Sequence, residues 1–210
     1  MLLDVWQFKS RSPSHSVILP DGCRDLIYKE TRGEAPKWFV SPFYDGAATV
    51  TTPHSTSMIG YRLRPGVNID ELALLRELGE LDPHSVDVED VLNSFVSIAP
   101  FTEDALSGLA EIDANSGSLA CRLGVSQRTL QRRLLFSTGK RPLYWVRLAR
   151  VRRAARLLNQ ERSISSVAYY VGYADQSHLT REFQHWFGTT PKAFMAQSDL
   201  ATSINSAGYD

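Results

Sequence analysis

The second half of this 210-residue chain contains an internal repeat, which constrains the fold more than any other feature. Residues 126–142 return 49 positions later as residues 175–191, and residues 119–124 return 48 positions later as residues 167–172. The second copy therefore carries one extra residue in its turn, and the repeat predicts two copies of one structural unit. The matched positions in the longer segment are Ser126, Leu130, Arg132, Leu134, Gly139 and Pro142 against Asp175, Leu179, Arg181, Phe183, Gly188 and Pro191.

Each copy predicts two short helices separated by a tight turn. In the first copy, Gly124 can adopt the positive φ that ends a helix, and Ser126 can cap the next helix. Gly172 and Asp175 hold the same positions in the second copy. The pattern fits a helix-turn-helix unit, or a helical hairpin that merely packs against its neighbour. Apolar residues at helical spacing would face the core: Leu119, Ala120, Leu123, Leu130 and Leu134, and then Val167, Ala168, Val171, Leu179 and Phe183.

The charges of the chain are segregated, although its formal net charge is zero. Residues 1–115 carry a net charge of −9, residues 116–196 carry +11, and residues 197–210 carry −2. A basic segment joined to an acidic one predicts a polyanionic partner for the basic segment alone. The alternative is a solvated basic face without a partner. Because both copies of the repeat lie in the basic segment, we favour DNA binding over simple helix packing.

The second helix of each copy is the expected DNA reader. Arg128, Gln131 and Arg132 share one face at helical spacing, and Ser177, Thr180 and Arg181 share the equivalent face in the second copy. Side chains of these types can bond base edges in the major groove. For any one of them the alternative is a phosphate contact or plain exposure to solvent. Arg132 and Arg181 are expected to contact DNA in either way.

A helix over residues 142–158 is expected between the two copies, with a buried stripe of Trp145, Leu148, Val151 or Ala155, and Leu158. Its 17 residues would span roughly 25 Å. A rigid spacer of this size could set the readers into successive major grooves, about 34 Å apart. The remaining surface would be basic and would add salt-sensitive affinity where it faces phosphates. Its arginines are Arg147, Arg150, Arg152, Arg153 and Arg156.

Short β-branched and aromatic segments between turns predict a small sandwich or barrel-like sheet over residues 1–65. These segments are residues 5–8, 16–19, 26–28, 38–40 and 58–61. Helical spacing in residues 70–79, 86–98 and 102–112 predicts a helical connector or dimerisation element over residues 66–113. Residues 114–117 are the expected linker, residues 114–196 the basic domain, and residues 197–210 a flexible tail. The expected class is α+β, with an all-α C-terminal domain of two helix-turn-helix units joined by a helix.

Residues 119–194 resemble the DNA-binding domain of AraC/XylS-type transcription regulators. The resemblance is most specific in residues 164–173 (ISSVAYYVGY), 175–183 (DQSHLTREF) and 187–191 (FGTTP). It implies a sequence-specific transcription regulator with double-stranded DNA and RNA polymerase as partners. His178 and Ala174 depart from the residues usual in that family. Carried over by position, the groove-facing residues are Arg128, Thr129, Gln131, Arg132, Gln176, Ser177, His178 and Arg181.

The acidic half is similar, more weakly, to a cupin-like N-terminal module of some such regulators. Residues 19–26 (LPDGCRDL) and 60–66 (GYRLRPG) carry this likeness. It implies that the half binds a small effector or forms a homodimer. The paired histidines of a cupin metal site are missing, since His15, His54 and His84 are isolated, so no metal or other cofactor is expected. The aromatic residues could line a pocket, although core packing is the favoured role: Trp6, Phe8, Tyr28, Trp38, Phe39 and Tyr61.

Several other classes are disfavoured by composition. No apolar run reaches the length of a membrane span, and residues 1–4 lack the basic start of a secretory signal. The lone thiols of Cys23 and Cys121 fall in different domains and fit a reducing cytoplasm without a cysteine-based zinc site. A DNA-alkylation repair enzyme would need a reactive cysteine cluster, so a non-enzyme is expected. A partner-binding role for the acidic half remains compatible with DNA binding.

Overall fold

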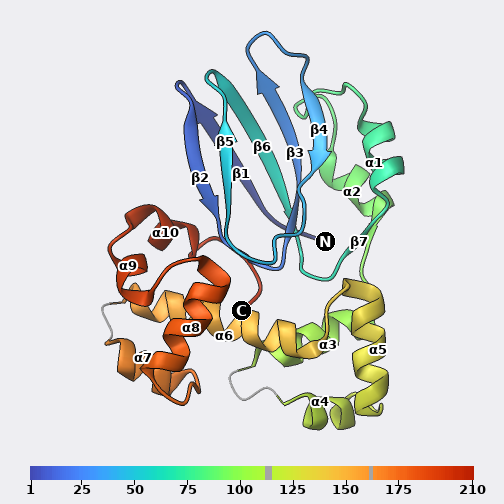
Figure 1. Ribbon diagram of the computed structural model, residues 1–210. Coiled ribbons are helices and arrows are strands. Elements are labelled where there is room, and N and C mark those ends of the chain that lie inside the picture. The colour runs from blue at the N-terminus through green and yellow to red at the C-terminus, as the bar shows by residue number, and fades with distance from the viewer. Residues whose placement is uncertain (112–114, 161–162) are drawn as a thin grey trace. The chain divides into compact units, whose positions relative to one another are not determined.

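The computed structural model describes residues 1–111, 115–160 and 163–210 (Figure 1). Residues 1–16, 23–43 and 49–99 make one compact unit, and residues 17–22, 44–48 and 100–210 make a second. In the described residues all strands precede residue 98, and only helices follow. The α+β class expected from the sequence is therefore confirmed, with a β-rich N-terminal part.

A four-stranded antiparallel sheet forms the first unit, in the order β1-β6-β3-β4. Its strands are β1 (Leu2–Ser10), β3 (Arg24–Thr31), β4 (Lys37–Val40) and β6 (Thr56–Leu63). Two short pairs accompany it, β2 (Ser14–Ile18) with β5 (Ala48–Thr52) and β7 (Asn68–Ile69) with β8 (Val96–Ser97). The five expected strands are all present, whereas β5, β7 and β8 were not anticipated.

Helices α1 (Glu71–Leu78) and α2 (Val88–Phe95) complete the core of the first unit. The side chain of Asp70 caps α1, and α2 ends where the chain turns into β8. Alternation along β3 sends Leu26 and Tyr28 to one face of the sheet. The cluster packed there consists of Leu26, Tyr28, Trp38, Leu63, Leu74, Leu78, Val88, Leu92 and Val96.

One glycine on the sheet is required by packing. Trp6 lies directly opposite Gly60 on the neighbouring strand, and a Cβ on Gly60 would stand 2.0 Å from Cε2 of the indole. The indole Nε1 donates to Asp25 Oδ1 at 3.1 Å, and Arg62 Nε donates to the same oxygen at 3.0 Å. Gly60 therefore leaves the space in which Trp6 can reach its acceptor.

The described part of the second unit is built from the helices α3 to α10. They are α3 (Pro100–Ala110), α4 (Ser116–Arg122), α5 (Gln127–Thr138), α6 (Pro142–Leu158), α7 (Ile164–Tyr170), α8 (Gln176–Phe187), α9 (Pro191–Met195) and α10 (Ser198–Ser203). Of the three expected connector helices, α1 and α2 lie in the first unit and α3 in the second. The expected end of the third, Ile112, lies outside the described residues.

Two segments differ from the expected linker and tail. Within residues 114–117, Asn115 caps α4, which begins at Ser116, while Ala114 lies outside the described residues. The segment 197–210, expected to be a flexible tail, is instead folded. Residues 198–203 form α10, and Ile204 and Tyr209 are buried. The physical reason is that the apolar side chains of this segment enter the core of the second unit.

Candidate nucleic-acid interface

Helices α4 and α5 form the first helix-turn-helix unit through the residues that the repeat singled out. Gly124, in the turn, has a φ of +67°. The Oγ of Ser126 accepts the backbone N–H of Thr129 at 3.2 Å and so caps α5. Leu130 and Leu134 are fully buried, which holds the inner face of α5 against the core.

Helices α7 and α8 repeat this construction. Gly172 has a φ of +80°, and Asp175 accepts the backbone N–H of His178 at 2.7 Å. Leu179 and Phe183 are fully buried. The reader helices α5 and α8 both end at a left-handed glycine and are followed by a helix that begins with proline. The two copies therefore have helix caps at the same positions and the same turn conformation, as well as a similar sequence.

Each reader helix leaves a polar face open to solvent. The structure places six of the eight expected contact residues on these faces as exposed side chains: Arg128, Gln131, Arg132, Gln176, Ser177 and Arg181. Within the residues that the structure describes, the guanidinium groups of the three arginines form no ion pair. Their charge is therefore available to a polyanion.

The other two expected contact residues are partly buried and engaged within the protein. Thr129 Oγ1 lies 2.9 Å from Ser126 Oγ at the start of α5. The ring of His178 packs edge-on against the ring of Tyr173, with centroids 5.1 Å apart. The guanidinium of Arg150 lies 5.7 Å from the centroid of the same Tyr173 ring. Both side chains therefore have less freedom than the six exposed ones.

The linker helix α6 has the predicted bounds and the predicted buried stripe. Trp145, Leu148, Val151 and Ala155 are fully buried, and Leu158 is 1% exposed. The expectation that its five arginines make the remaining surface basic was wrong for Arg152, which is also only 1% exposed. Helix α6 therefore contributes less free positive charge than its sequence suggests.

Arg147 joins the linker helix to the second reader. Its Nη2 donates to Glu182 Oε1 at 2.7 Å, and its Nε donates to Oε2 at 3.1 Å. The indole Nε1 of Trp186 donates to the same carboxylate at 3.3 Å. Burial alone would raise the pKa of Glu182, but the hydrogen bonds and charge of Arg147 outweigh it, so the pKa is lowered. The pair fixes α8 against α6 through a charged contact.

Arg152 binds three backbone carbonyls from distant parts of the chain. Its guanidinium donates to Pro20 O at 3.4 Å, to Ile204 O at 3.5 Å and to Ser206 O at 3.1 Å. Arg156 Nε also donates to Ile204 O, at 3.2 Å. Residues 204–206 and the turn at Pro20 are therefore structural parts of the second unit.

Two N-terminal turns were missed as parts of this unit. A Cβ on Gly22, whose φ is +75°, would stand 2.9 Å from the Trp145 ring and 3.1 Å from Tyr209 Cβ. In the second turn, Lys140 Nζ pairs with Asp45 at 2.6 Å. In the sequence, the glycines of residues 20–22 and 45–46 indicate tight turns. They do not indicate that these turns contact helix α6 or Lys140.

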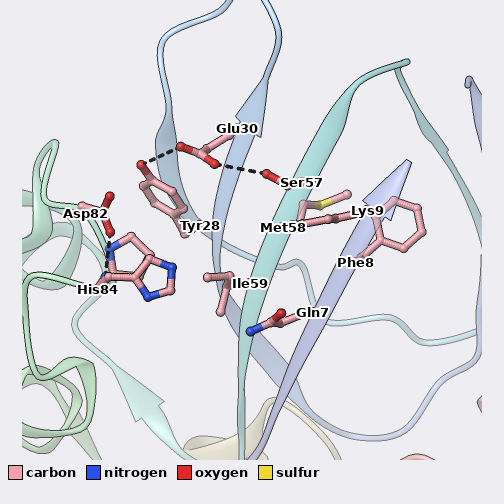
Figure 2. Close-up of a pocket in the computed structure, with 11 residues that line it drawn as sticks. Gln7, Phe8, Lys9, Tyr28, Glu30, Ser57, Met58, Ile59, Asp82 and His84 are labelled. Carbon is pink, nitrogen blue, oxygen red and sulfur yellow. Dashed lines mark hydrogen bonds between the residues drawn. The ribbon is translucent and has the colours of Figure 1, made fainter. Parts of the chain in front are cut away.

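A pocket in the first unit lies between the sheet and residues 82–84, with a volume of about 170 Å³ (Figure 2). Glu30 accepts from the hydroxyls of Tyr28 at 3.5 Å and Ser57 at 3.1 Å. Burial, and then the charges of Glu30 and Asp82, raise the pKa of Tyr28. Of the aromatic residues considered from the sequence, Phe8 and Tyr28 line this pocket. Tyr28 also belongs to the core cluster, together with Trp38.

The second half of the chain is similar to known helix-turn-helix proteins. Residues 119–197 match the model of a family described as "Helix-turn-helix domain". The chain is 51% identical over 86 residues to the HTH-type transcriptional regulator RipA of Corynebacterium glutamicum. It is 34% identical over 87 residues to the HTH-type transcriptional activator RhaS of Pectobacterium carotovorum. Residues 119–197 therefore form a helix-turn-helix domain.

The extent of these likenesses differs between the relatives. Each alignment covers 41% of this chain, but only 25% of RipA and 31% of RhaS. Over nearly its whole length the chain has the fold of ToxT from Vibrio cholerae O395. That match covers 97% of this chain and 98% of ToxT, with a TM-score of 0.50 and 10% identity.

The described residues contain neither a cluster of metal-ligand side chains nor a membrane-spanning helix. Across residues 1–111, 115–160 and 163–210, no three His, Cys, Asp or Glu side chains are grouped so that they could hold a metal ion. No helix in the same ranges is long and apolar enough to span a bilayer.

Proposed function

We propose that this chain is a sequence-specific transcription regulator of the AraC type, which binds double-stranded DNA with both of its helix-turn-helix units. The observation that carries the proposal is the repeated capped helix-turn-helix, because each copy leaves a polar face on its second helix. We propose that α5 and α8 enter successive major grooves. The proposed DNA contacts are Arg128, Thr129, Gln131, Arg132, Gln176, Ser177, His178 and Arg181.

The charge distribution supports this proposal. Residues 116–196 carry a net charge of +11, and the three reader arginines are exposed. Release of counterions from phosphates would make the affinity fall steeply with salt. Because the arginines of α6 are largely engaged within the protein, the salt-sensitive contacts are expected to come mainly from the reader helices.

The acidic, β-rich half is proposed to modulate DNA binding, either through a small effector or by forming a homodimer. The pocket of Figure 2 is the proposed effector site. Its lining carries two carboxylates, Glu30 and Asp82, against the single ammonium group of Lys9, so we propose a small positively charged molecule as the effector. RNA polymerase is the proposed protein partner. We propose a cytoplasmic protein without catalytic activity.

The DNA-binding proposal is tested by titrating the full chain against duplexes selected from a random library, at several salt concentrations. Wild type should bind selected duplexes with a steep negative salt dependence. Arg132→Ala and Arg181→Ala should each lower specific affinity by about 1–3 kcal/mol. Arg11→Ala, which removes the same charge from an exposed position in the first unit, is the matched control and should change little. Failure to enrich any sequence, or binding that is insensitive to salt, would overturn the proposal.

Sedimentation velocity of the full chain separates the two proposed roles of the acidic half. A dimer at micromolar concentration supports dimerisation. A monomer whose affinity for DNA changes when a small amine is added supports effector binding. A monomer that no such molecule affects argues against both.

A further inference from the structure

Thr180 occupies a reading position on the second reader helix. The offset of 49 aligns it with Gln131 of the first unit, and it shares a helix face with Ser177 and Arg181. Its side chain is half-buried, between the buried Leu179 on one side and the exposed Arg181 on the other. Thr180 is thus placed beside the proposed DNA contacts without being one of the eight.

The hydroxyl of Thr180 is already committed to the helix. Its Oγ1 donates to the backbone carbonyl of Gln176 at 2.9 Å. A threonine hydroxyl has a single proton to donate, so this one cannot donate to an acceptor on a base edge without breaking that bond. The side chain then offers a partner its methyl group and the acceptor lone pairs of its oxygen, but no proton.

One feature of the major groove matches a methyl group. The C5-methyl of thymine is the apolar group that base edges present there, and a threonine methyl is among the groups that contact it. At the equivalent position the first unit carries an amide, Gln131, which can bond adenine. The duplicated readers therefore differ in chemistry at the same position.

We propose that Thr180 reads a thymine in the second half-site through contact of its methyl group with the thymine C5-methyl. The inference rests on the proposed function, since it requires α8 to enter a major groove. It goes further by naming a specificity-determining residue and the base that it selects.

The test uses the full chain and the duplexes that it selects from a random library. Each thymine of a selected duplex is replaced in turn by deoxyuridine, which lacks only the C5-methyl. Dissociation constants are measured for wild type, Thr180→Val and Thr180→Ser. Valine keeps the methyl and replaces the hydroxyl with a second methyl, whereas serine keeps the hydroxyl and removes the methyl. The two variants therefore separate the methyl group from the hydroxyl group.

At one thymine, deoxyuridine should weaken binding of wild type and Thr180→Val about fourfold, the value of roughly one buried methyl group. Thr180→Ser should bind the thymine and deoxyuridine duplexes equally. The inference is overturned if Thr180→Ser keeps the methyl discrimination, if Thr180→Val loses it, or if no thymine methyl matters to wild type. Failure to select any sequence would instead overturn the proposed function itself, and the inference with it.

Discussion

Removing Arg147 and Glu182 singly and together measures how firmly α6 holds the second reader helix. The two hydrogen bonds of the pair are 2.7 and 3.1 Å long, and the side chains are 39% and 12% exposed, respectively. Hydrogen bonds to charged groups contribute about 1.5–3 kcal/mol, and exposed ion pairs about 0.2–1 kcal/mol. Because solvent screens the more exposed arginine, we expect a coupling energy of about 1–2 kcal/mol at pH 7.

The coupling should also depend on pH. The folded-state pKa of Glu182 lies below its ordinary value of 4.5, so folding favours the charged carboxylate. The stabilisation is therefore present above pH 4.5 and is lost as the pH falls through the lowered folded-state pKa. Urea unfolding of wild type, Arg147→Ala, Glu182→Ala and the double variant, followed by far-UV circular dichroism, gives the coupling energy at pH 7 and pH 3. A value under about 0.3 kcal/mol at pH 7, within ordinary additivity, would refute the reasoning, as would a coupling energy that is unchanged at pH 3.

Two further substitutions test the packing of the two units. Gly60→Ala should destabilise the first unit by about 1–3 kcal/mol in urea unfolding, because its new Cβ overlaps the Trp6 ring; Gly46→Ala, whose nearest neighbour would be 3.8 Å away, should have little effect, and equal effects would contradict the packing. Arg152→Met should cost about 2–4 kcal/mol and increase proteolysis of residues 197–210, because buried carbonyls lose their donor. Arg150→Met should cost under about 1 kcal/mol, and an equally small loss at Arg152 would show that its buried contacts contribute little.

The fold of the repeat could be predicted because its signals are local. Gly124 and Ser126, like Gly172 and Asp175, are close to the helix ends that they set, and helical spacing identified the buried residues on each side. The bounds of α6 were predicted for the same reason, since Pro142 can begin a helix and the apolar stripe ends at Leu158. Local propensity and helical period were enough there.

The parts that could not be predicted depend on contacts distant in sequence. Arg152 lies in an arginine-rich helix and was therefore expected at the surface, yet its acceptors are 132, 52 and 54 positions away. The segment 197–210 is polar on average, but its few apolar side chains are buried and make it part of the second unit. Strand β5 was missed because its sequence, ATVTT, carries a single large apolar residue and its ladder is with β2.

The eight proposed DNA contacts could be predicted only in part. The sequence predicted which helix faces carry them, and the structure places six of the side chains in solvent. It adds that Thr129 and His178 have partners inside the protein, Ser126 and Tyr173 respectively, which were not predicted. Which of the eight touches a base remains a prediction for the variants described above.

The most direct test of the central claim changes the spacing between the two half-sites of a selected duplex. Since one helix, α6, joins both readers, the chain can engage both half-sites only when they lie about one turn of DNA apart on the same face. We predict that inserting five base pairs, about half a turn, lowers the affinity for the duplex to that for a single half-site. An affinity that does not change after the insertion would contradict the claim that the two units read successive major grooves.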